Sequence, residues 1–217
     1  MDFLNDIKVY DNVLDTQSSK QVFEFLSRNF YTLARTNDSA TLERSKNFLR
    51  EERTQEELDT FKSNFLEQQL RDSSIREKDL KADKLYWTRI HKGAPECTAE
   101  DEELCVALYD ALKVVCDLPP YQVLGNVYTN MLRCMDRPTA HIDNIDPKNR
   151  TIMFYTNNEW YRDWGGETIF YDLDDNIIKA VQPKPGRVVS FDGRIPHSAR
   201  PPVTSAYTPR YITVMKF

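Results

Sequence analysis

The sequence predicts an α+β fold in which helices come first and a sheet of short strands follows. The first half is charged and has helical periodicity, whereas the chain after residue 120 consists of β-type runs separated by turn residues. Many short strands at regular spacing favour a sandwich or barrel, which the helices would support on one face. The runs of this half are 122–131, 151–156, 168–171, 177–181, 187–192 and 211–217.

The N-terminal residues indicate one strand and one core-facing helix. Residues 7–10 are typical of a short strand, and Asp15 or Thr16 is expected to cap the helix that follows. Apolar residues of this helix recur at the i, i+3, i+4, i+8 spacing of a buried face, at Val22, Phe25, Leu26 and Phe30.

A second clear helix is predicted to begin at the sequence Thr98-x-x-Asp101 and to stop before Pro119-Pro120. The apolar residues that share one face of this helix are Leu104, Leu108, Ala111, Leu112 and Val115.

The very polar stretch of residues 36–80 is interpreted as a helical insertion or lid. Thr54-x-x-Glu57 has the pattern of a helix capping box. A narrow apolar stripe follows it, formed by Leu58, Phe61, Phe65 and Leu66. The insertion is therefore expected to pack on one side only.

A length of 217 residues fits a single domain, 1–217, with helical support in 1–120 and a β core in 121–217. The net charge of −5 disfavours a protein that binds nucleic acid by overall phosphate attraction. No stretch approaches the roughly 18 apolar residues of a membrane span.

The four cysteines and the N-terminus bear on the compartment. The cysteines form no C-x-x-C pair and are expected to be buried, reduced thiols, at Cys97, Cys105, Cys116 and Cys134. The first residues lack the basic region and apolar run of a signal peptide. These observations predict a cytoplasmic protein.

Two of the three histidines lie in a pattern suited to a metal. His141-Ile142-Asp143 places two ligating side chains on one face of a strand, because alternate strand residues point the same way. His197 follows the β-type run 187–192 through a turn and would supply a second imidazole. Two histidines and a carboxylate on one face of an octahedron form the facial triad of non-haem iron oxygenases. The alternative for H-x-D is a pair of unrelated surface residues, and His91 lies outside the pattern.

Arg210 is a candidate anion-binding residue at the start of the last apolar run, 211–217. A 2-oxoacid chelating iron needs a cation for its distal carboxylate, and the planar guanidinium makes paired hydrogen bonds to that group. The alternative is a solvent-facing cation at the edge of the strand.

The segment from Thr139 to Phe217 resembles the catalytic double-stranded β-helix of iron(II)- and 2-oxoglutarate-dependent oxygenases, most of all the prolyl 4-hydroxylase branch. The resemblance depends on six segments in the family's order. These are His141-Ile142-Asp143-Asn144, Phe154-Tyr155-Thr156-Asn157-Asn158-Glu159-Trp160, Gly165-Gly166-Glu167-Thr168, Pro185-Gly186-Arg187-Val188-Val189-Ser190-Phe191, Ile195-Pro196-His197 and Arg210-Tyr211-Ile212-Thr213-Val214. It implies an α+β fold with a jelly-roll core and N-terminal supporting helices.

The resemblance also implies the site residues. His141, Asp143 and His197 would bind iron(II), and Arg210 would pair with the C5 carboxylate of 2-oxoglutarate. Tyr155 stands where the family places a second donor to that carboxylate, although a packed core aromatic is the alternative.

Three further residues are weaker candidates for the same pocket. Tyr128 and Asn130 precede His141 on an expected strand, and Thr213 lies on the last one. Some relatives carry a tyrosine ten residues before the first metal ligand, where this chain has Met131, so Tyr128 is an inexact match.

The implied activity is a dioxygenase that consumes 2-oxoglutarate and O2 and hydroxylates a C–H bond, with ascorbate supporting turnover. A carboxylate at Asp143 favours hydroxylation over halogenation. The substrate is expected to be a prolyl residue of a protein or peptide, and the alternative is a free amino acid or other small molecule. A second alternative is a non-catalytic β-helix module that binds a metal or 2-oxoacid. Nucleic acid and membrane are not expected as partners.

Overall fold

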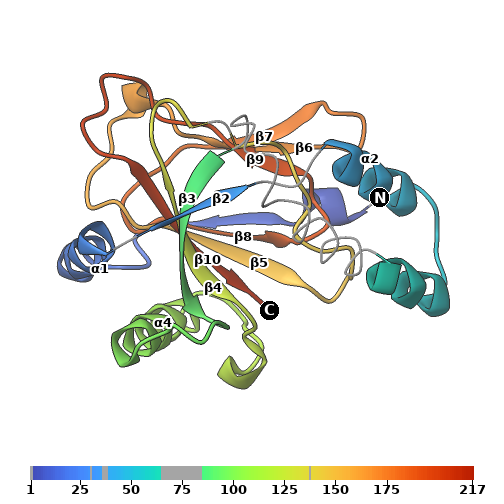
Figure 1. Ribbon diagram of the computed structural model, residues 1–217, viewed down its shortest axis with the longest axis horizontal. Helices are drawn as coiled ribbons and strands as arrows, with labels where there is room; N and C mark the ends of the chain where they lie inside the picture. Colours follow the sequence, from blue (N-terminus) through green and yellow to red (C-terminus); the bar gives the residue numbers. More distant parts are fainter. Residues whose placement is uncertain (1, 30, 36–38, 65–84, 137) are drawn as a thin grey trace.

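Two antiparallel sheets face each other in the computed structural model, which describes residues 2–29, 31–35, 39–64, 85–136 and 138–217 (Figure 1). The larger sheet has the order β1 (Ile7–Tyr10), β8 (Val188–Asp192), β5 (Arg150–Tyr155), β10 (Arg210–Lys216), β4 (Val127–Leu132), β3 (Leu85–Lys92) and β2 (Thr32–Arg35). The smaller sheet consists of β7 (Ile177–Val181), β6 (Thr168–Tyr171) and β9 (His197–Ala199). The predicted α+β fold with a double-stranded β-helix core is confirmed.

Alternating side chains of the larger sheet divide the apolar residues between two cores. On β5, Met153 and Tyr155 face the smaller sheet, whereas Ile152 and Phe154 face the helices. On β10, Ile212 and Val214 face inward in the same way. Both faces of the sheet are buried, which explains why β5, β8 and β10 are nearly continuous apolar runs rather than alternating ones.

Helices α1 (Thr16–Arg28) and α4 (Ala99–Leu112) cover the outer face of the larger sheet (Figure 1). The Asp15 side chain caps α1 by accepting a hydrogen bond from the Ser18 backbone, 2.7 Å away. Thr98 and Asp101 form the predicted capping box of α4. These caps satisfy backbone N–H groups that the first turn of each helix leaves without partners.

The described part of the insertion forms two helical segments that dock on loops of the β core. These are α2 (Ser39–Leu49) and the helical residues 55–64, joined by a 4.1 Å ring contact between Phe48 and Phe61. Lys46 pairs with Asp175 at 2.8 Å in the loop between β6 and β7. The capping box of Thr54 and Glu57 is confirmed, while Phe65 and Leu66 lie outside the described residues.

Several strand and helix predictions differ from the structure. Strands β2, β3 and β9 were not predicted, and β1, β2 and β3 join the larger sheet from residues before 120. The predicted strand 122–131 begins only at Val127, because residues Tyr121–Val123 form a 3-10 turn. Helix α4 ends at Leu112, six residues before the leucine that precedes Pro119, and Val115 is exposed. Phe30, the last residue of the α1 stripe, lies outside the described residues.

The cysteines are unpaired, as expected, but only Cys105 is buried. Cys134 is exposed because it lies in the turn closed by the hydrogen bond from Asp136 N–H to the Arg133 carbonyl. The prediction of four buried thiols was therefore wrong. Among the described helices, none combines the length and apolar character needed to cross a membrane.

Candidate metal and anion-binding site

His141, Asp143 and His197 converge at the junction of the two sheets. Their ligand atoms all lie within 4.8 Å of one another. A pair of backbone hydrogen bonds between His141 and His197, each 2.9 Å long, joins the two histidines across an isolated bridge. The predicted strand at 141–143 is not formed, since His141 makes only an isolated bridge and Asp143 lies in a bend, but both side chains reach the cluster.

Both imidazoles are oriented by hydrogen bonds to the backbone two residues earlier. His141 Nδ1 lies 3.2 Å from the Thr139 carbonyl oxygen, and His197 Nδ1 lies 3.0 Å from that of Ile195. A carbonyl oxygen only accepts, so each Nδ1 carries the proton and each Nε2 presents a lone pair. Both Nε2 atoms lie 3.6 Å from an oxygen of Asp143, too far for a hydrogen bond and close enough to share one ion.

The charges of the cluster suit a cation. Burial alone would raise the pKa of Asp143, but the Lys216 ammonium and the two imidazoles hold it well below its usual value. Burial and the neighbouring His141 lower the pKa of His197 to about 4, so its ring is neutral at physiological pH. Two imidazoles and one carboxylate are the donor set of a non-haem iron(II) site, and these residues fit that metal.

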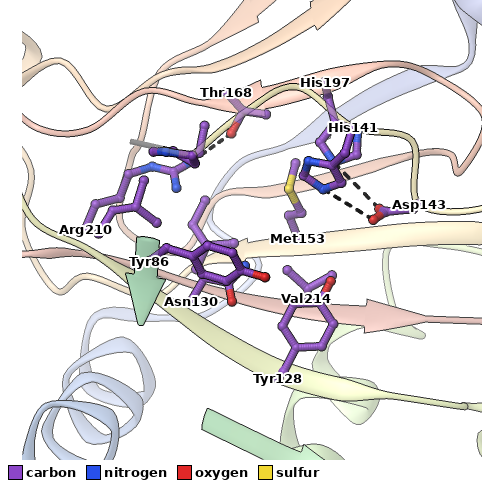
Figure 2. Close-up of a pocket in the computed structure, with 14 residues that line it drawn as sticks. Tyr86, Tyr128, Asn130, His141, Asp143, Met153, Thr168, His197, Arg210 and Val214 are labelled. Atoms are coloured by element: carbon purple, nitrogen blue, oxygen red, sulfur yellow. Dashed lines mark hydrogen bonds and ion pairs between the residues drawn. The ribbon is translucent and has the colours of Figure 1, made fainter. Parts of the chain in front are cut away.

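Arg210 lies at the other end of the same pocket, across from the three metal ligands (Figure 2). Its side chain is only 2% exposed. Nη2 donates to Thr168 Oγ1 at 2.7 Å, and Nε has no hydrogen-bond partner among the described residues. Burial lowers the pKa of this guanidinium, which shows that the charge lies in an unfavourable environment. A buried cation without a carboxylate beside it requires an anionic ligand, and the residues fit 2-oxoglutarate.

Tyr155 supports this anion site from behind rather than lining it. Its hydroxyl donates to Thr168 Oγ1 at 2.8 Å and lies 3.0 Å from the Val181 carbonyl, and its ring lies 5.5 Å from the Arg210 guanidinium carbon. Tyr155 can give its single hydroxyl proton to Thr168 or to the Val181 carbonyl, whereas Thr168 Oγ1 accepts from Arg210 Nη2 and lines the pocket. The structure thus brings Tyr155 to the predicted cluster, with Thr168 as the residue that faces a ligand.

Of the three weaker candidates, two line the pocket. Tyr128 and Asn130 face it from β4, and the buried Asn130 Oδ1 has no hydrogen-bond partner among the described residues. Thr213 points to the opposite face of β10, where its hydroxyl lies 2.8 Å from that of Thr129. The geometry therefore does not support a cofactor contact for Thr213.

The pocket has a cavity volume of about 70 Å³. Apolar residues separate its two polar ends, as Met153 and Val214 do in Figure 2. The complete lining consists of Tyr86, Tyr128, Asn130, Leu132, Pro138, His141, Asp143, Met153, Thr168, His197, Ala199, Arg210, Ile212 and Val214.

Sequence reasoning missed four polar residues of this region. Thr151 donates to Asp143 Oδ2 at 2.8 Å, Lys216 Nζ lies 2.8 Å from Asp143 Oδ1, and Thr168 and Tyr86 line the pocket. Thr168 had a signal, because it lies two residues after the Gly165-Gly166 pair. Gly166 has φ +81°, and a Cβ there would lie 2.8 Å from Trp160 and 3.2 Å from Arg210, so only glycine lets this segment pass the arginine.

One family model matches the chain, over the stretch that contains all four predicted ligand-binding residues. Residues 129–215 match the model described as the 2OG-Fe(II) oxygenase superfamily. The predicted resemblance to that superfamily is thereby confirmed for this stretch. Members of the superfamily use iron(II), 2-oxoglutarate and O2. No curated protein sequence matches the chain.

Several solved structures are similar to this chain. An oxidoreductase of the 2OG-Fe(II) oxygenase family from Burkholderia pseudomallei has a TM-score of 0.54 at 10% identity, covering 98% of this chain and 85% of that one. A prolyl hydroxylase from Trichoplax adhaerens, in complex with a hypoxia inducible factor peptide fragment, has a TM-score of 0.46 at 18% identity, covering 93% and 90%. A prolyl-4-hydroxylase from Pseudomonas putida has a TM-score of 0.41 at 15% identity, covering 91% and 97%. The first of these supports the fold.

Proposed function

We propose that the chain is an iron(II)- and 2-oxoglutarate-dependent dioxygenase that hydroxylates a C–H bond, with a prolyl residue of a protein or peptide as its substrate. The reaction converts substrate, 2-oxoglutarate and O2 into hydroxylated substrate, succinate and carbon dioxide. One observation carries the proposal: a single pocket holds the His141, Asp143 and His197 cluster and, opposite it, the buried guanidinium of Arg210, whose Nε has no hydrogen-bond partner among the described residues.

Each end of the pocket has its own task. His141, Asp143 and His197 would hold iron(II), which supplies the oxygen activation when it is bound together with the 2-oxoacid. Arg210 and Thr168 would hold the distal carboxylate of 2-oxoglutarate and set its orientation toward the metal ligands.

The residues between the two ends shield the chemistry from water. Met153, Ile212 and Val214 form an apolar wall between the cation and the metal ligands. Such a wall strengthens the ionic contacts within the pocket and limits side reactions with solvent.

The substrate proposal depends on the motifs. The segments around His141, Gly165 and His197 resemble the prolyl 4-hydroxylase branch, which favours a prolyl residue. A free amino acid or another small molecule is the alternative. A cytoplasmic location and support of turnover by ascorbate belong to the same proposal.

The proposal is tested by binding and by turnover. Titration with Mn(II), followed by 2-oxoglutarate, should show one metal site and then one site for the co-substrate. With iron(II), ascorbate and a panel of proline-containing peptides, succinate should form in proportion to a 16 Da mass increase of a peptide. Tight zinc binding without 2-oxoglutarate binding or succinate formation would instead indicate a non-catalytic metal-binding module.

The Arg210→Ala variant separates the two ends of the pocket. It should weaken 2-oxoglutarate binding by about 100-fold, since truncating one partner of a buried charge pair costs about 2–5 kcal/mol, and leave Mn(II) affinity nearly unchanged. Arg150→Ala is the matched control, because Arg150 also lies on an inner strand but pairs with Asp6. Equal loss of metal and 2-oxoglutarate in Arg210→Ala would show that the arginine is structural.

A further inference from the structure

Lys216 places a second cation on the inner face of β10, at the end opposite Arg210. Arg210, Ile212 and Val214 line the pocket, and alternate residues of a strand share a face, so Lys216 is the next residue on that face. Its Nζ lies 2.8 Å from Asp143 Oδ1. Arg210 thus lies at one end of the pocket, and the Lys216 ammonium contacts Asp143, a residue that lines it.

The contacts of Lys216 leave part of its side chain accessible. Its side chain is 30% exposed, and Asp143 is its carboxylate partner within the described residues. Nζ also lies 5.4 Å from the ring centroid of Tyr128 and interacts with the Tyr128 hydroxyl. An ammonium has three donors, so one remains for a ligand beside Tyr128, which itself lines the pocket.

A bound metal changes the charge balance around Lys216. A divalent cation at His141, Asp143 and His197 would interact with the single negative charge of Asp143, which then no longer neutralises Lys216 alone. Four positive charges, two from the metal and one each from Arg210 and Lys216, then face three negative charges, one from Asp143 and two from 2-oxoglutarate. The uncompensated positive charge lies at the Lys216 end, where a partly buried ammonium favours an anionic partner.

We propose that Lys216, assisted by Tyr128, is a specificity-determining residue that holds a carboxylate of the substrate beside the metal. This inference rests on the proposed function and narrows it to substrates with a carboxylate close to the oxidised carbon. That carboxylate has two possible sources: the free α-carboxylate of the target amino acid, or the acidic side chain of the residue next to it in a peptide. In both cases a charge-assisted hydrogen bond to Lys216 fixes the orientation of the substrate.

A binding experiment on the protein loaded with Mn(II) and 2-oxoglutarate, without oxygen, tests this. The probes are N-acetyl amino acids against their amides, and N-acetyl-X-aspartyl amides against N-acetyl-X-asparaginyl amides, with X each of the twenty amino acids. Paramagnetic relaxation of the probe protons by Mn(II) reports binding next to the metal. At least one carboxylate probe should bind about tenfold more tightly than its neutral match, and the pair that shows this preference identifies the source of the carboxylate.

Variants test whether the Lys216 side chain causes the preference for carboxylate probes. Lys216→Met should bind the charged and neutral probes equally, Lys216→Arg should keep the preference, and Tyr128→Phe should reduce it. Lys62→Met is the matched control: Lys62 pairs with Asp146, which lies outside the pocket lining, so the preference should persist. A role confined to neutralising Asp143 would change Mn(II) affinity without changing the ratio between paired probes.

Two results would overturn the inference alone: normal binding of Mn(II) and 2-oxoglutarate with no carboxylate preference in any probe pair, or a preference that survives in Lys216→Met. If Lys216→Met does not fold, the wild-type comparison and the Tyr128→Phe variant still decide. Failure of the wild-type protein to bind Mn(II) or 2-oxoglutarate would overturn the proposed function and this inference with it.

Discussion

All three histidines of the chain lie beside an aspartate, but the two clusters that they form differ in what their ring nitrogens contact. In the first cluster, His91 Nδ1 lies 2.7 Å from Asp101 Oδ1 and His91 Nε2 lies 2.8 Å from Thr129 Oγ1. Arg89 Nη2 donates to both oxygens of Asp101 at 2.9 Å, and Thr98 donates to Asp101 from its backbone and side chain. Every polar atom of this buried cluster has a partner.

In the second cluster, the ring nitrogens are divided between two tasks. Nδ1 of His141 and of His197 contacts a backbone carbonyl, and each Nε2 faces Asp143 at 3.6 Å without a hydrogen bond. The comparison teaches that residue types do not distinguish a binding site from a structural network. Lone pairs without a hydrogen-bond partner distinguish the two, because a metal binds through such lone pairs, whereas burying them unpaired in a packed core costs free energy.

Replacing Asp143 should have the largest effect, and mainly on binding. Asp143→Ala is expected to weaken Mn(II) affinity by more than about 100-fold, since loss of a direct ligand exceeds the 10–100-fold typical of its supporting hydrogen bonds. The melting temperature of the metal-free protein should fall only slightly, because the groups that lose a partner are the partly exposed Lys216 ammonium and the Thr151 hydroxyl. Calorimetric titration and circular dichroism would check both. A large drop in melting temperature would contradict the separation between the clusters.

Replacing Asp101 should have the opposite outcome. Asp101→Ala removes the partner of His91 and Arg89 and the capping box of α4, so the free energy of unfolding should fall by about 3–5 kcal/mol. Mn(II) affinity of the folded fraction should stay within about twofold of wild type. Urea unfolding measures the free energy of unfolding, and Mn(II) titration at low temperature measures the metal affinity. Loss of metal affinity equal to that of Asp143→Ala would show that the networks are coupled.

The hydrogen bond from Thr151 to Asp143 should matter less. Thr151→Val keeps the side-chain shape but removes the donor 2.8 Å from Asp143 Oδ2. Metal affinity is expected to fall by about tenfold, the lower end for residues that orient a ligand. Thr129→Val, which removes the donor to the His91 network instead, is the matched control and should leave metal affinity unchanged.

The pH dependence of stability should give the smallest effect. Burial lowers the pKa of His91 below 6.5 despite the opposing effect of Asp101. The unfolded chain then binds a proton that the folded chain resists, so the contribution of His91 is complete above about pH 6.5 and declines as the pH falls below it. Between pH 7 and 5.5 the free energy of unfolding should fall more steeply for the wild type than for His91→Gln. If the free energy of unfolding, measured with denaturant, changed with pH to the same extent in the wild type and in His91→Gln, the pKa of His91 would not be lowered.

Much of the site could be predicted because its signals are local. The H-x-D spacing brings His141 and Asp143 close together along the chain, and the Gly165-Gly166 pair marks a close approach of the backbone. Lys216 carried no such signal, because nothing in the run 211–217 shows that its sixth residue meets Asp143. Thr213 was misplaced for a related reason: its side chain lies on the face opposite Ile212 and Val214.

By itself, the sequence determined helices α1 and α4, most strands of the β core and the chemistry of the iron and 2-oxoglutarate candidates, since periodicity, caps and donor types are properties of neighbouring residues. Only the tertiary structure decided which polar groups have partners. His91 is saturated by Asp101 and Thr129, Arg210 is left without a carboxylate, and Lys216 lies against a metal ligand, because strand register brings together residues far apart in the chain. Whether a buried charge is structural or functional depends on those long-range contacts.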